Sequence, residues 1–128
     1  MKAIRIYADT SVFGGVFDDE FQQPSQTFFV QVKSGQFVLV TSAVVQSELA
    51  AAPPTVRRFF EEMLGLAEVT DITANALALR DAYLQAKIVT PKYADDALHV
   101  ALATVAGCAL IVSWNFQHIV HFQKIPLY

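Results

Sequence analysis

The chain has 128 residues and a formal net charge of −3, and 54% of its residues are hydrophobic whereas only 16% are charged. This composition excludes disorder, and the length excludes two independent hydrophobic cores, so we expect one domain spanning residues 1–128. The acidic balance argues against a protein that bulk charge holds on nucleic acid, although an acidic metal site subtracts charge that divalent cations restore. The apolar surplus predicts a surface for a partner subunit, and therefore a homodimer or a higher oligomer.

Cysteine content and targeting signals indicate the compartment. Cys108 is the one cysteine of the sequence, which excludes an intrachain disulfide and a zinc site built from cysteines. No charged-then-apolar segment of the secretory kind begins the sequence, and no apolar run reaches membrane-spanning length. We therefore expect a cytoplasmic protein that does not enter a membrane.

Short apolar runs alternate with helical patterns along the chain. Gly14 and Gly15 are expected to break the pattern after the first strand, and the acidic run at 18–20 to form a polar loop. Gly35 and Gly107 are expected to end helices. Strands are predicted at 4–8, 37–41, 67–69, 109–113 and 125–128, and helices at about 24–34, 43–49, 55–64, 74–86 and 93–105.

Nearly all-apolar strands that alternate with helices predict an α/β domain with a parallel sheet covered on both faces. In such sheets, chemistry gathers beyond the carboxyl ends of the strands. Asp9, Ser42 and Asn115 all fall just after a predicted strand, and Glu48 and Asp96 lie on the helices near them. We expect these polar side chains to meet at one edge of the sheet.

Three acids stand out because their neighbours in sequence are otherwise apolar: Asp9, Glu48 and Asp96, the last with Asp95 beside it. Each has an ordinary structural interpretation, as a helix N-cap, an exposed helix residue and a helix N-terminal acid respectively. Converging carboxylates without basic partners repel one another unless a divalent cation neutralises them. Oxygen ligands without a cysteine or histidine cluster favour Mg²⁺ or Mn²⁺ over Zn²⁺.

Four ordered motifs carry a family resemblance. They are Tyr-Ala-Asp-Thr-Ser-Val at 7–12, Ser-Ala-Val-Val-Gln-Ser-Glu-Leu at 42–49, Asp-Ala-Leu-His-Val-Ala-Leu-Ala at 96–103, and Leu-Ile-Val-Ser-Trp-Asn-Phe at 110–116. Together they resemble the PIN-domain family, many small members of which are VapC-type toxins of toxin–antitoxin pairs. The resemblance implies a three-layer α/β/α fold around a mainly parallel sheet of four to five strands.

The resemblance also implies a function and a set of site residues. Asp9, Glu48 and Asp96 would bind Mg²⁺ or Mn²⁺, and Asn115 would occupy the catalytic Asp-or-Asn position after the last core strand. Ser113 matches the small polar residue before it, and a hydroxyl of residue 10 or 11 would support the acids. The implied activity is Mg²⁺-dependent hydrolysis of RNA phosphodiester bonds, with a small antitoxin protein as partner. Asn115 supplies no charge, so a second metal site is not implied.

Alternative interpretations remain open at this stage. The chain could be a non-catalytic PIN-fold module that binds RNA or a protein. A haloacid-dehalogenase-type phosphatase also begins with a strand ending in Asp, but Ser11 stands where such enzymes need a second Asp. His99 is either a hydrogen-bonded core histidine or a ligand at the site, and Trp114 either packs at the strand end or stacks on a base.

Overall fold

The computed structural model describes residues 3–86 and 94–114, with the backbone alone of residues 94–96. Its centre is a four-stranded, wholly parallel sheet in the order β3-β2-β1-β4. The strands are β1 (Ile4–Ala8), β2 (Phe37–Ser42), β3 (Glu68–Thr70) and β4 (Leu110–Val112). The predicted parallel sheet of four to five strands is therefore confirmed, whereas the expected strand at 125–128 and residue 115 lie outside the described residues.

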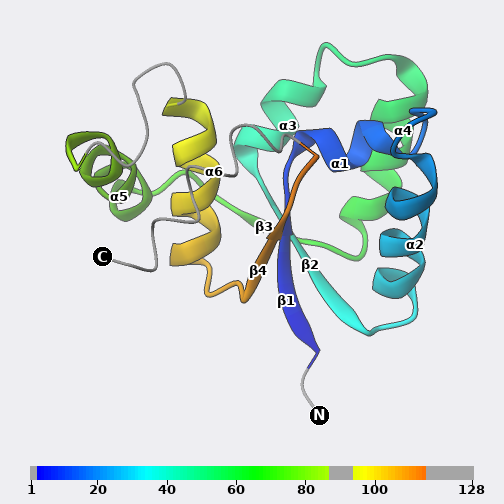
Figure 1. The fold of residues 1–128 in the computed structure, drawn as a ribbon, viewed down its shortest axis with the longest axis horizontal. Helices are drawn as coiled ribbons and strands as arrows, with labels where there is room; N and C mark the ends of the chain where they lie inside the picture. The colour runs from blue at the N-terminus through cyan, green and yellow to red at the C-terminus, as the bar shows by residue number, and fades with distance from the viewer. Residues whose placement is uncertain (1–2, 87–93, 115–128) are drawn as a thin grey trace.

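Six helices among the described residues connect and cover the strands. Helices α1 and α2 lie with α4 on one side of the sheet, and α5 and α6 lie on the other, which gives the predicted three layers (Figure 1). Each predicted helix is present with boundaries within two residues, and α1 is an additional helix that only the N-cap interpretation of Asp9 anticipated. The bounds are α1 (Thr10–Gly15), α2 (Gln22–Lys33), α3 (Ala43–Leu49), α4 (Pro54–Leu64), α5 (Ala74–Gln85) and α6 (Ala94–Val105).

The prediction that Gly14 and Gly15 break the pattern after the first strand is wrong in that both are helical, as the last two residues of α1. Asp9 caps this helix, and neither glycine has a left-handed backbone. Gly15 is buried, and a Cβ atom there would lie 2.5 Å from Ser25 Oγ and 2.7 Å from Trp114 Nε1. A close approach between elements therefore requires this glycine. By contrast, Gly35 (φ 85°) and Gly107 (φ 74°) follow α2 and α6 in the left-handed region, as expected of helix-ending glycines.

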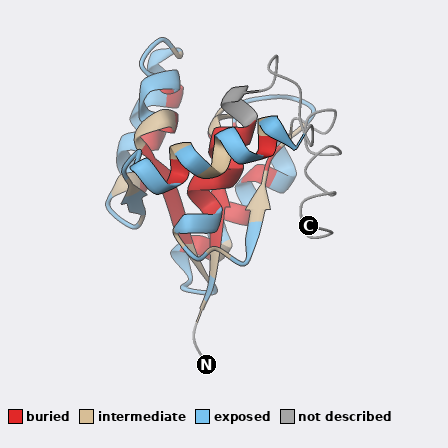
Figure 2. Ribbon diagram, turned by 90° about the vertical axis from the view of Figure 1, so that its left-hand side faces the viewer, coloured by how far each residue is buried: buried red, intermediate tan, exposed pale blue. Residues whose placement is uncertain are grey.

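The core lies against both faces of the sheet. On one face, the Phe13 ring contacts Phe29 at 5.2 Å and Phe60 at 4.9 Å between ring centroids, which joins α1, α2 and α4. On the other face, α6 buries Ala97 and Ala101, small side chains that let the helix approach the sheet closely. Figure 2 shows the buried residues gathered on the sheet and the helix faces that meet it. None of the helices among the described residues could cross a membrane.

Candidate active site

The carboxyl ends of β1, β2 and β4 meet at one edge of the sheet. Ala8 at the end of β1 is paired with Val112 at the end of β4, and the backbone N–H of Asp9 donates to the Val112 carbonyl. Ser42 ends β2 on the other side of β1 and becomes the N-cap of α3. The parallel topology thus brings residues that are far apart in sequence to one edge, as the strand pattern predicted.

Asp9 is buried at the start of α1, with 6% of its surface exposed. Its Oδ1 accepts hydrogen bonds from the Ser11 backbone N–H at 3.0 Å and from the Ser11 hydroxyl at 2.5 Å. The N-cap interpretation is therefore confirmed. It does not compete with a role in chemistry, because both of these bonds end on Oδ1 and fix the direction of the carboxylate.

Ser11 connects Asp9 to the end of β4. Besides donating to Asp9, its hydroxyl oxygen accepts from the Trp114 backbone N–H at 2.9 Å and lies 3.5 Å from the Ser113 hydroxyl. The Trp114 indole N–H donates to Ser25 Oγ at 2.9 Å, and the indole ring stacks on Phe21 at a centroid distance of 5.4 Å. The packing interpretation of Trp114 is thereby confirmed, and the tryptophan braces the strand end that holds Asp9.

Glu48 lies on α3, with 41% of its side chain exposed. Its Oε1 accepts hydrogen bonds from the Thr10 hydroxyl at 3.0 Å and from His99 Nε2 at 2.7 Å. The hydrogen bond from His99 is the main cause that lowers the pKa of Glu48 below its ordinary value, against the opposing effect of partial burial. Glu48 is therefore an oriented carboxylate at the partly exposed rim of the site, and of residues 10 and 11 it is Thr10 whose hydroxyl donates to it.

A buried chain of hydrogen bonds continues from His99 into the sheet. His99, which is 6% exposed, places Nδ1 2.6 Å from the Tyr7 hydroxyl, and that hydroxyl lies 2.8 Å from Ser42 Oγ. Burial is the main cause that raises the pKa of Tyr7, and the negative charges of Asp9 and Glu48 raise it further. Both acids therefore lie within electrostatic reach of one buried phenol.

Sequence reasoning left His99 as either a hydrogen-bonded core histidine or a ligand, and the core interpretation is confirmed because the residue is buried and both ring nitrogens have partners. It missed Tyr7 and the bond to Glu48. The available signal was a tyrosine in the first strand, two residues before Asp9.

The other predicted site residues can be placed only in part. Position 96 lies at the start of α6, three residues before His99 and therefore one turn away along the helix, but its side chain is outside the described part of the structure. Asn115 also lies outside the described residues. Asp96 and Asn115 stay predictions.

The donor set of Asp9 and Glu48 fits a hard divalent cation. Both are carboxylates, and neither forms an ion pair with a lysine or arginine among the described residues. Within residues 3–86 and 94–114 no cluster of three acids, histidines or cysteines suited to a metal is present, so a metal site built on these two acids would require a further ligand. Oxygen donors of this kind suit Mg²⁺ or Mn²⁺ better than Zn²⁺.

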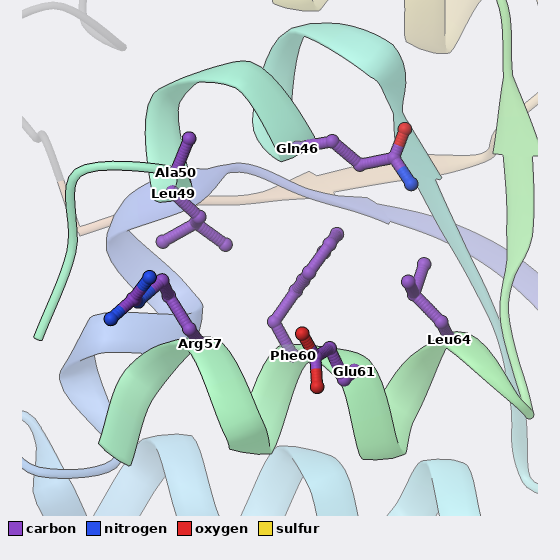
Figure 3. Close-up of a pocket in the computed structure, with 7 residues that line it drawn as sticks. All are labelled: Gln46, Leu49, Ala50, Arg57, Phe60, Glu61 and Leu64. Atoms are coloured by element: carbon purple, nitrogen blue, oxygen red, sulfur yellow. The ribbon is translucent and has the colours of Figure 1, made fainter. Parts of the chain in front are cut away.

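A separate cavity of about 200 Å³ lies between α3 and α4, and neither Asp9 nor Glu48 lines it. Figure 3 shows the Phe60 ring of α4 between Leu49 of α3 and Leu64 of α4, with Arg57 and Glu61 also from α4. Because neither acid lines it, this cavity is separate from the candidate active site.

No protein-family model matches this sequence, and no curated protein matches it. Solved structures do match. The VapC20 toxin of Mycobacterium tuberculosis, described as cleaving the sarcin–ricin loop, is similar with a TM-score of 0.69 over 90% of this chain and 93% of that one. VapBC2 of Rickettsia felis, solved bound to a DNA fragment from its promoter, is similar with a TM-score of 0.62 over 92% and 95% of the two chains. Sequence identity is 15% in both cases. The fold is therefore the predicted PIN-like fold of VapC toxins.

Proposed function

We propose that this protein is a divalent-metal-dependent endoribonuclease and the toxin of a type II toxin–antitoxin pair. The observation that carries the proposal is the meeting of Asp9 and Glu48 at the carboxyl edge of the sheet, where Thr10, the neighbour of Asp9, donates to Glu48. Neither carboxylate forms an ion pair with a lysine or arginine in the described residues, so both remain available as oxygen ligands for a divalent cation. The fold shared with VapC20, a toxin that cleaves the sarcin–ricin loop, supports RNA as the substrate class.

In this proposal Asp9, Glu48 and Asp96 hold Mg²⁺ or Mn²⁺. The bound cation would lower the pKa of a water molecule and neutralise charge that develops on the phosphate. Ser11 fixes the Asp9 carboxylate through its N–H and hydroxyl, and Thr10 fixes that of Glu48. Asn115 would orient water or phosphate through its amide without adding charge. These roles follow the PIN-like pattern of the sequence.

The proposal extends to partners and location. Large apolar side chains remain exposed, among them Phe17 (49% exposed) before α2 and Val30 (63% exposed) on it. An exposed apolar surface of this kind favours a protein partner. The name VapBC2 indicates a toxin with its antitoxin, and we therefore propose that a small antitoxin covers this apolar surface. We also propose that the chain forms a homodimer and acts in the cytoplasm.

The test is a cleavage assay with the purified chain. Total bacterial RNA, and DNA oligonucleotides that carry the sequences of its abundant RNAs, are incubated with the protein in Mg²⁺, in Mn²⁺ and in EDTA. The new ends are mapped by sequencing. We expect internal cuts in RNA with either cation and none with EDTA. Equal cutting of DNA would refute RNA as the substrate class. Metal binding without any cutting would instead favour a non-catalytic RNA- or protein-binding module.

A further inference from the structure

We propose that His99 is a positioning residue for the Glu48 carboxylate, and that a hydrogen-bond chain from Ser42 through Tyr7 sets the direction in which His99 donates. This inference rests on the proposed function, because the carboxylate to be positioned is that of a metal ligand. Three elements supply the chain: α6 carries His99, β1 carries Tyr7, and Ser42 joins β2 to α3.

The direction of the chain follows from counting protons. Ser42 Oγ already accepts the Val45 backbone N–H at 3.2 Å as the cap of α3, so its own proton needs an acceptor. Among the described residues, the Tyr7 oxygen at 2.8 Å is the acceptor within reach. With Ser42 donating to it, Tyr7 uses its single proton toward His99 Nδ1 at 2.6 Å. The imidazole proton then sits on Nε2, which faces Glu48 Oε1 at 2.7 Å.

As a consequence, the two oxygens of the Glu48 carboxylate have different surroundings. Oε1 accepts from both His99 and Thr10, and the described residues make no hydrogen bond to Oε2. One oxygen is thus held by the protein, and the other is left for a cation. Partners that orient metal ligands in this way typically change metal affinity by about 10- to 100-fold when they are removed. The chain also explains why a tyrosine and a histidine are buried beside two acids rather than replaced by apolar residues.

The decisive experiment measures Mn²⁺ affinity by calorimetry for the parent, His99→Leu and His99→Gln. Leucine fills the buried position but cannot donate a hydrogen bond to Glu48, whereas the glutamine amide nitrogen can take the place of Nε2. We expect the Kd for Mn²⁺ to rise about 10-fold or more in His99→Leu and to return most of the way to the parent value in His99→Gln. An unchanged Kd in His99→Leu would overturn the inference, as would a folded His99→Gln that binds no better than His99→Leu.

A double-mutant cycle tests the chain beyond His99. Tyr7→Phe keeps the ring at a fully buried position and removes only the hydroxyl, which has no hydrogen bond to Glu48 itself. We expect Tyr7→Phe to weaken Mn²⁺ binding in the parent but not in the His99→Leu background, because its effect passes through the imidazole. An equal loss of Mn²⁺ affinity in the two backgrounds would refute the claim that Tyr7 acts through His99. Thr10→Val serves as the matched control, because it removes the other bond to Oε1 and should weaken binding in both backgrounds.

A nitrogen NMR measurement on the metal-free protein separates this inference from the proposed function. The inference requires one His99 tautomer, with the proton on Nε2, in the parent, and a weaker preference for it in Tyr7→Phe, where the Glu48 carboxylate alone still accepts that proton. A parent that binds no Mn²⁺ would defeat the proposed function, and the tautomer would then still decide whether His99 donates to Glu48. A proton found on Nδ1 alone, or a mixture of tautomers in the parent, would overturn the inference whatever the metal affinity.

Discussion

Two adjacent glycines of α1 are expected to respond to alanine in opposite ways. A Cβ atom at Gly14 would meet nothing within 4 Å, whereas one at Gly15 would lie 2.5 Å from Ser25 Oγ and 2.7 Å from Trp114 Nε1. Both residues lie in the same helix and neither has a left-handed backbone, so their intrinsic preferences are matched. The pair therefore isolates the effect of the close approach between α1, α2 and the end of β4.

The magnitudes follow from these contacts. Gly14→Ala should gain at most about 0.5–1 kcal/mol of stability, the advantage of alanine over glycine in a helix interior, because Gly14 lies in the last turn of α1. Gly15→Ala gains the same term but must displace a fully buried serine and a tryptophan, and such overpacking costs about 1–3 kcal/mol. Moving Ser25 also removes its bond from the indole N–H, worth about 1 kcal/mol. We expect Gly15→Ala to be destabilised by about 1–3 kcal/mol.

Urea unfolding followed by tryptophan fluorescence measures both variants, because Trp114 is the one tryptophan of the chain and lies at the perturbed contact. The slope of the transition should stay unchanged while the midpoint moves up for Gly14→Ala and down for Gly15→Ala. A Gly15→Ala protein as stable as Gly14→Ala would refute the close approach.

Three further outcomes are expected. Thr73→Ala removes the N-cap of α5, whose hydroxyl oxygen accepts the Ala76 N–H at 3.1 Å, and should lower the free energy of unfolding by about 1 kcal/mol, measured by urea titration. Burial raises the pKa of Cys108, so iodoacetamide should alkylate this thiol more slowly at neutral pH in the folded chain than in urea. The hydrogen bond from His99 lowers the pKa of Glu48, so this carboxylate stabilises the fold above its ordinary pKa of 4.5 and loses that effect as pH falls through the lowered value. In EDTA, the stability difference between parent and Glu48→Gln should thus be present at neutral pH and vanish in acid; a constant difference would contradict it.

The sequence predicted most of the fold because its strands are continuous apolar runs and its helices carry recognisable caps. Asp9 could be found because it directly follows such a run, and strand ends gather at one edge of a parallel sheet. The glycine pair was misjudged because local pattern treats two glycines as a break. The reason for Gly15 is a contact with Ser25 and Trp114, and no local pattern contains it.

The same limit applies to the hydrogen-bond chain. Tyr7 and His99 are 92 residues apart, and His99 and Glu48 are 51 apart, so their pairing depends on the packing of α6 and α3 around β1. A histidine on an apolar helix indicates a buried side chain with a hydrogen-bond partner, but which residue is that partner depends on the assembled fold. Asp96 and Asn115 rest on sequence alone and stay predictions.

The central claim, that Asp9 is a metal-binding acid of a ribonuclease, is tested most directly by one rate comparison. The rate of Mg²⁺-dependent RNA cleavage is measured for the parent, Asp9→Asn and Asp18→Asn under the same conditions. Asp18 is the matched control, because it is an exposed aspartate whose Oδ1 also accepts local N–H groups, those of Glu20 and Phe21. Asparagine keeps an acceptor oxygen for these bonds, so both variants should fold.

We expect Asp9→Asn to lose at least about a hundredfold in rate, since the removed charge is one that stabilises the cation and the transition state, while Asp18→Asn keeps about the parent rate. Parental cleavage by a folded Asp9→Asn would contradict the account, and so would an equal loss in Asp18→Asn.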